Sequence, residues 1–299
     1  RELMGSPGSL DQELWDAAVE QGWPLLSSPE AWGGLGMGIS GLAVLAEALG
    51  RAAASLPLIP AFASLLLCEA SDPDTISGIA TDLAIGKKMA CLALAMKGDS
   101  GLALTDSAIE LSSGKLSGST GSTPFAAVAD YALLAVNVNG DIALALVALD
   151  QPGVERQQSS SVAPSRCSAA LKFNDAEIVA LSSADTSEQP EKIAALSALA
   201  TAFEQIGGAE ACMFMARDYA LERVAFGQPI GRFQAIKHKL ADMYWRIELA
   251  RGCALAALDA YAASESDWMT KAAAARLAAI EAYEYSATEN MQTHGGLGT

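Results

Sequence analysis

The feature that most constrains this chain is a series of three long stretches of helical periodicity near its C-terminal end, separated only by short turns. They cover about 191–222, 232–263 and 268–293. In the second stretch, apolar residues recur at steps of three and four: Phe233, Ile236, Leu240, Met243, Ile247, Ala250, Ala254, Leu258 and Tyr261. This spacing is typical of a helix that buries one narrow face. The sequence therefore predicts a C-terminal helical bundle whose apolar faces also form an oligomer interface.

The turn between the first two stretches, residues 223–234, has a distinctive composition. Gly227 and Pro229 are expected to end the first helix and redirect the chain. Two arginines, a phenylalanine and a glutamine are then displayed at a helix-helix corner. On residue types alone, packing is the commoner role for such a corner, with Arg223 paired to a carboxylate and Phe226 filling core. Ligand binding is the alternative.

In the preceding part of the chain, the spacing of apolar residues changes once, from a helical to a strand-like pattern. Helical patterns are found at about 10–21, 39–54 and 60–70, and the last is expected to end at the polar break 71–74. From about 89 to 178, short apolar runs alternate with clusters of Gly, Asn, Asp, Ser and Pro. That pattern predicts strands and turns, with Asn139-Gly140 as a hairpin.

These patterns predict an α+β, multidomain chain. The expected domains are an N-terminal helical domain (1–88), a middle β-barrel or β-sandwich domain (89–182) and a C-terminal domain of the four-helix-bundle type (183–299). The last boundary lies in a polar stretch, where Ser187 is expected to cap the following helix and Pro190 to lie in its first turn.

The charge balance limits the partners of the chain. With 19 basic and 35 acidic residues, its net charge is −16. This argues against nucleic acid or an anionic membrane as a partner. An anionic ligand must then be met by locally placed arginines, lysines and backbone N–H groups.

Cysteine and histidine usage indicates the compartment and excludes some chemistry. The five cysteines are scattered and odd in number, which favours reduced thiols in the cytoplasm over a disulfide framework or a zinc site. Only two histidines are present, so no multi-histidine metal site is expected. The sequence contains no long continuous apolar span, and its start is unlike a signal peptide; we expect both ends to be trimmed relative to the native product.

Three segments resemble the acyl-CoA dehydrogenase family. The corner Arg223-Val-Ala-Phe226-Gly-Gln-Pro-Ile230-Gly-Arg-Phe-Gln234 is similar to the family's Arg-x-x-Phe-Gly-x-x-Ile/Leu-x-x-x-Gln. The C-terminal Gln292-Thr-His-Gly-Gly-Leu-Gly is similar to its Gln-x-x-Gly-Gly-x-Gly. The loop at 29–38, which fits neither the Walker nor the dinucleotide fingerprint, resembles the family's early Pro-Glu-x-x-Gly-Gly-x-Gly.

The resemblance implies α,β-desaturation of an acyl-CoA thioester, with FAD as hydride acceptor and electron-transfer flavoprotein as electron partner. It also implies that the corner of one subunit reaches the FAD held by its dimer mate. The implied FAD-binding residues are Arg223 at the pyrophosphate, Phe226 and Ile230 packed around the cofactor, Gln234 toward the adenine, and Gln292, Gly295 and Gly296 near the phosphates. One departure is Ala225, where the family usually has Thr or Gln.

Further departures concern the flavin ring and the catalytic base. Segments 95–101 and 119–125 do not reproduce the family's Thr-Glu-Pro-x-x-Gly-Ser-Asp and Trp-Ile-Thr segments. The family's glutamate base would fall beyond residue 299 or, in a minority of members, at Ser197, a hydroxyl too weakly basic for the reaction. The nearest carboxylate is Glu204, two helical turns away, for which a solvated or ion-paired role is the better interpretation.

We therefore expect one subunit of an acyl-CoA dehydrogenase-type flavoprotein in lipid metabolism, a dimer of dimers. Bacterial members that act on steroid side-chain thioesters include heteromers, and this chain resembles the subunit that completes the FAD site, with the base on a homologous partner. The alternatives are a homo-oligomer, a structural homologue without flavin, and a related flavin fold with a different reaction.

Overall fold

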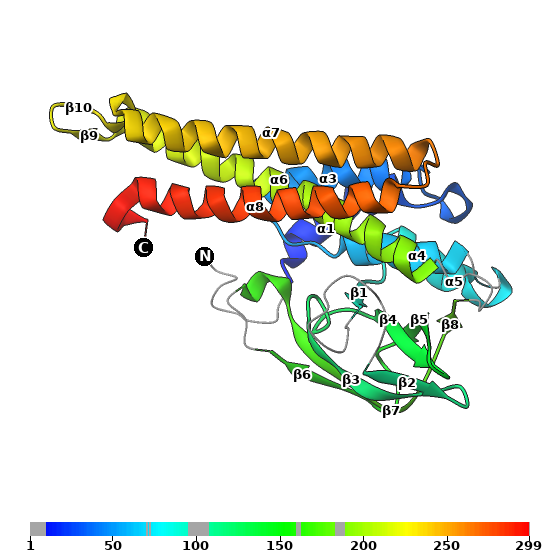
Figure 1. The fold of residues 1–299 in the computed structure, drawn as a ribbon. Helices are drawn as coiled ribbons and strands as arrows, with labels where there is room; N and C mark the ends of the chain where they lie inside the picture. Colours follow the sequence, from blue (N-terminus) through cyan, green and yellow to red (C-terminus); the bar gives the residue numbers. More distant parts are fainter. Residues whose placement is uncertain are drawn as a thin grey trace. The chain divides into compact units, whose positions relative to one another are not determined.

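The computed structural model describes residues 10–69, 71, 73–94, 108–159, 163–182 and 189–298. Contacts divide the chain into two compact units: residues 1–42 with 55–197, and residues 43–54 with 198–299. The predicted order of helices, then strands, then helices is confirmed (Figure 1). The predicted boundaries at 88 and 182 differ from this division, and they remain a proposal about folding domains.

Short helices form the N-terminal part of the first unit. They are α1 (Gln12–Glu20), α2 (Trp23–Ser27), η2 (Glu30–Trp32), α4 (Leu58–Glu69) and α5 (Pro73–Ala84). Asp11 caps α1, because its carboxylate accepts a hydrogen bond from Leu14 N at 3.0 Å. The break predicted at 71–74 is short, and α5 begins at Pro73. Proline suits a first helical turn, where its missing N–H leaves no bond unmade.

The middle of the chain forms an eight-stranded sheet, strongly curved in Figure 1. The strands are β1 (Ala90–Ala93), β2 (Ile109–Ser112), β3 (Lys115–Thr123), β4 (Tyr131–Val138), β5 (Asp141–Ala148), β6 (Val154–Gln158), β7 (Ala169–Glu177) and β8 (Ala180–Leu181). Their order is β6-β7-β3-β2-β4-β5-β8, with β1 parallel to β4. The predicted hairpin at Asn139-Gly140 is confirmed: it joins β4 to β5, and both residues have positive φ, 55° and 101°.

Strand β4 is buried on both faces, which explains its continuous apolar sequence. Ala132, Leu134 and Val136 belong to the core cluster inside the curved sheet. The alternate residues Leu133 and Ala135 belong to a second cluster that includes side chains of α4 and α5. Because successive side chains of a strand point to opposite faces, β4 joins the two cores.

The second unit is built on long helices. They are α6 (Gln189–Glu222), α7 (Gln234–Ala262) and α8 (Trp268–His294), with residues of α3 (Gly38–Arg51) from position 43 onward. The three predicted C-terminal helices are confirmed to within two residues at each end. In Figure 1, α6, α7 and α8 run alongside one another with α3 beside α6. The fourth helix of the predicted bundle therefore comes from the N-terminal part of the chain. No helix of the described residues is long and apolar enough to cross a membrane.

Two glycines allow α3 and α6 to approach backbone to backbone. A Cβ atom on Gly207 would lie 2.0 Å from Glu47 O, and one on Gly50 would lie 1.8 Å from Glu204 O. Beside this contact, the Arg251 guanidinium lies 3.1 Å from Glu47 and 3.0 Å from Glu210. Burial disfavours the charged form of Arg251, but these carboxylates outweigh it and raise its pKa. The helix contact thus combines close packing with ion pairs.

Candidate functional site

The corner after α6 is a tight hairpin. Helix α6 ends at Glu222, where the sequence predicts its end, and Gly227 and Pro229 lie beyond it rather than in its last turn. They form the hairpin instead, since β9 (Val224–Ala225) pairs with β10 (Gln228–Pro229). The two loop residues, Phe226 and Gly227, have φ of 53° and 80°, as the two-residue hairpin turn requires.

Phe226 occupies this turn at a conformational cost. A positive φ is unfavourable for a bulky side chain and costs on the order of 1 kcal/mol. Its ring is 96% exposed, and its described aromatic neighbour is Phe233, at 6.2 Å between centroids in an edge-to-face arrangement. The ring therefore does not fill the core of this chain. A strained and exposed aromatic side chain at a hairpin tip is a candidate contact for another molecule.

A cavity of about 410 Å³ lies where the end of α6 meets the end of α8. It is lined by Tyr219, Arg223, Ile230, Thr293, His294, Gly295, Gly296 and Leu297. Four of the predicted FAD-binding residues, Arg223, Ile230, Gly295 and Gly296, are thus brought together from distant parts of the sequence. Figure 1 shows the hairpin and the C-terminal end of α8 at the same end of the helices.

Arg223 has a fixed backbone and an uncommitted side chain. Its N–H donates to Tyr219 O at 2.8 Å, and its carbonyl accepts from Ile230 N at 2.8 Å. Its guanidinium forms no ion pair with any described residue, whereas Arg217 pairs with Asp218. In a chain with a net charge of −16, an arginine kept clear of carboxylates is suited to an anionic ligand.

The glycines allow backbone to approach a ligand closely. Gly295 ends α8 with φ 59° and ψ −137°, a conformation that favours glycine. A Cβ atom on Gly296 would meet no atom of the described chain within 4 Å. Internal packing therefore does not explain the glycine at 296, and the space beside it is open to another molecule. Together with Arg223, this cavity suits a diphosphate such as that of FAD.

Tyr219 and His294 also line the cavity, and the sequence does not single them out as binding residues. The two rings stack with centroids 4.2 Å apart, and His294 Nδ1 lies 2.9 Å from Asn290 O. A signal for Tyr219 is present in the sequence, because it lies in the last turn of α6 four residues before Arg223, the residue that follows this helix. Nothing local in the sequence brings His294 to that face.

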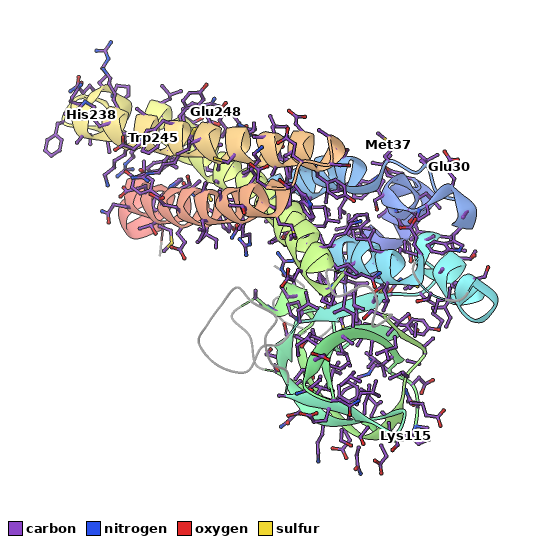
Figure 2. The ribbon with its side chains drawn as sticks, turned by 45° about the vertical axis from the view of Figure 1, so that its right-hand side comes forward. Glu30, Met37, Lys115, His238, Trp245 and Glu248 are labelled. Atoms are coloured by element: carbon purple, nitrogen blue, oxygen red, sulfur yellow. The ribbon has the colours of Figure 1, made fainter. Side chains whose placement is uncertain are left out.

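Three predicted residues lie outside this cavity. Phe226 lies at the hairpin tip, and Gln292 is an exposed residue in the last turn of α8. Gln234 begins α7, and its Nε2 lies 2.8 Å from His238 Nε2. Figure 2 shows His238 near the corner end of α7, with Trp245 and Glu248 further along the same helix. The roles of these three residues remain a prediction.

The alternative positions for a catalytic base contain no exposed carboxylate. Ser197 is a buried residue of α6. Glu204 is half-buried and interacts electrostatically with Arg276, whose pKa is lowered by burial and partly restored by Glu204. This surrounding fits the ion-paired role expected for Glu204.

The threonine hydroxyl groups of the segment 119–125 form hydrogen bonds within the sheet. Leu171 N donates to Thr120 Oγ1 at 2.9 Å, and Thr123 Oγ1 donates to Thr120 Oγ1 at 3.3 Å. Phe125 follows, buried and with φ 63°. These hydroxyl groups are therefore engaged without any ligand. The other degenerate segment, 95–101, lies outside the described residues.

Comparison with known proteins identifies the family. Residues 4–71 match the model for the N-terminal domain of acyl-CoA dehydrogenase, and residues 191–299 match the model for its C-terminal domain. The acyl-CoA dehydrogenase IpdE2 of Mycobacterium tuberculosis is 33% identical over 306 residues, which cover 99% of this chain and 79% of IpdE2. The human mitochondrial short-chain specific acyl-CoA dehydrogenase is 28% identical over 322 residues, covering 100% of this chain and 78% of the human protein.

Solved structures agree with this similarity. A chain of the Tcur3481-Tcur3483 steroid ACAD (G363A variant) superposes with a TM-score of 0.91 and 26% identity, over 100% of this chain and 82% of that one. A chain of the ChsE4-ChsE5 complex of Mycobacterium tuberculosis gives a TM-score of 0.86 and 26% identity, over 97% and 79%. The sequence motifs, the fold and these relatives together establish that the chain belongs to the acyl-CoA dehydrogenase family.

Proposed function

We propose that this chain is the subunit of a heteromeric, FAD-dependent acyl-CoA dehydrogenase that completes the FAD site, while a homologous partner subunit supplies the catalytic glutamate. The observation that carries the proposal is the cavity lined by Arg223, Gly295 and Gly296, where Arg223 pairs with no carboxylate of the described residues and a Cβ on Gly296 would meet no described atom within 4 Å. The hydroxyl of Ser197 at one position of the family's base points to the partner as its source.

FAD, when bound, supplies the acceptor for the hydride from the β-carbon of the acyl thioester. This chain's residues hold it. Arg223 would hold the diphosphate, which a guanidinium matches better than an ammonium group. Gly296 would allow the phosphates close to the backbone, and Ile230 would supply an apolar contact from the lining of the cavity. Phe226 offers its exposed ring to the cofactor or to the subunit that holds it.

Removal of the α-proton needs a carboxylate shielded from water, with its pKa raised toward neutrality. A serine hydroxyl cannot perform this step at neutral pH, and Glu204 lies two turns from the family position, about 10 Å along the helix. That displacement far exceeds the tolerance of proton transfer. The partner, or sequence beyond residue 299, therefore has to provide the base.

The substrate class follows from the relatives. The Tcur3481-Tcur3483 protein is a steroid ACAD, and its similarity supports a steroid-derived acyl-CoA thioester as substrate here. Electron-transfer flavoprotein is the proposed electron acceptor, as the family resemblance implies. Five free cysteines support the cytoplasm as the proposed location.

The test is to co-express the chain with candidate homologous subunits and to purify the complex. We expect a yellow complex whose flavin absorption is bleached by the cognate acyl-CoA under anaerobic conditions. The chain expressed alone is expected to be inactive. A complex without flavin would support the structural homologue instead. A flavin that no acyl-CoA bleaches, but that another reductant does, would support a different reaction.

A further inference from the structure

His294 lines the cavity, and two interactions hold its side chain in place. Its ring stacks on Tyr219 at 4.2 Å, and its Nδ1 lies 2.9 Å from Asn290 O. A carbonyl oxygen can only accept a hydrogen bond, so Nδ1 carries the proton. Nε2 is then the ring nitrogen left for a ligand in the cavity.

The protonation state of Nε2 decides what it offers. In the neutral ring Nε2 is an acceptor, which does not suit a phosphate oxygen. Once protonated, it is a charged donor next to Arg223 in the same cavity. Arg223 disfavours a second positive charge when no anion is present, and a bound diphosphate reverses that preference by attracting both cations.

Other charged groups nearby do not supply this switch. The titratable side chains that line the cavity are Tyr219, Arg223 and His294. The elements around it also carry charged or titratable side chains outside the lining, among them Glu222 of α6, Arg232 of η4 (Ile230–Arg232), Lys237, His238 and Lys239 of α7, and Glu289 of α8. Lys239 and Glu289 form an ion pair with each other. Among the side chains that line the cavity, His294 is the one whose residue type ordinarily changes its charge between about pH 5 and pH 8.

We propose that His294 binds the diphosphate of FAD as an imidazolium, so that this chain takes up a proton when the cofactor binds. The proposal rests on the proposed FAD site and adds a second cationic ligand to it. Coenzyme A also contains a diphosphate, and the recognition chemistry is shared between the two molecules. FAD is the ligand proposed here, and coenzyme A is an arm of the test.

The test measures FAD binding to the purified, flavin-stripped complex. FAD affinity of the unaltered complex is expected to fall about tenfold between mildly acidic and mildly alkaline pH, because only a protonated imidazole donates a hydrogen bond from Nε2. Titration calorimetry in buffers of different ionisation enthalpy should show fractional proton uptake. In His294→Gln both effects should disappear, with FAD bound about as weakly at low pH as the unaltered complex binds it at high pH.

His238→Gln is the matched control, since His238 is the other histidine of the chain and lies outside the cavity. It should retain the proton uptake. FAD binding without proton uptake in the unaltered complex, or uptake that persists in His294→Gln, would overturn the inference while leaving the FAD site intact. Absence of FAD binding at every pH would overturn the proposed function itself. Proton uptake with coenzyme A but not with FAD would assign the site to the thioester carrier and also overturn the inference.

Discussion

Replacing Gly207 by alanine tests the close contact between α3 and α6. The new Cβ would lie 2.0 Å from Glu47 O, and on the opposite helix Gly50 is confined in the same way by Glu204 O. Both obstacles are backbone atoms, so no side-chain rotation relieves them. The helices must separate by roughly 1 Å, at an overpacking cost of about 3 kcal/mol or more. Alanine has a better helix propensity than glycine, which stabilises the variant by about 1 kcal/mol and leaves a net loss of about 2–3 kcal/mol in the free energy of unfolding.

Gly252→Ala is the matched control, because Gly252 is an exposed residue inside α7 and a Cβ there meets no described atom within 4 Å. It should stabilise the protein by about 0.5–1 kcal/mol. Thermal unfolding followed by far-UV circular dichroism checks both variants. The melting temperature of Gly207→Ala should fall by about 5–10 °C, at about 2–4 °C per kcal/mol for a chain of this size. Equal, small shifts in the two variants would refute the backbone contact.

Three further predictions concern the site and the thiols. Arg223→Ala should weaken FAD binding by about 2–4 kcal/mol without loss of fold. The flavin content of the complex after dialysis measures this loss. Arg217→Ala is the control, because Arg217 forms its ion pair with Asp218 on α6. Glu204→Gln should leave turnover of the active complex within about threefold, since it removes no base, and a thousandfold fall with FAD retained would make Glu204 the base. Burial raises the pKa of both Cys68 and Cys91 to about 12. Alkylation of the native protein near neutral pH, read by mass spectrometry, should therefore spare them, and rapid labelling of either would contradict their burial.

The sequence predicted those elements whose pattern is long or whose turn chemistry is specific. The helices α6, α7 and α8 repeat apolar residues over many turns, and Asn139-Gly140 can hardly form anything but a hairpin. The sequence does not predict helix α5, because Pro73 lies in a polar break that is typical of a helix end, whereas in the structure it begins a helix. Strand β3 was missed because its exposed positions are serine and glycine, with few apolar residues to mark an alternation.

The candidate site was predictable only in part. The family motifs selected Arg223 and Gly296, but the composition of the corner alone favoured packing. No local pattern could show that the end of α8 returns to the end of α6, because that depends on how long helices pack. The close contacts of Gly50 and Gly207 could not be predicted for the same reason. A glycine in a helix indicates a close helix-helix contact only when the helix that packs against it is known.

The exposed ring of Phe226 has a consequence for handling the protein. A side chain that is exposed to solvent at the tip of a hairpin, next to the proposed FAD-binding residues, is suited to be covered by a neighbouring subunit. Subunit association and flavin binding are then thermodynamically linked, and each must strengthen the other by the same factor. Dilution should release flavin, and added flavin should hold the complex together. The flavin content of a sample is then also a measure of how far its subunits have dissociated.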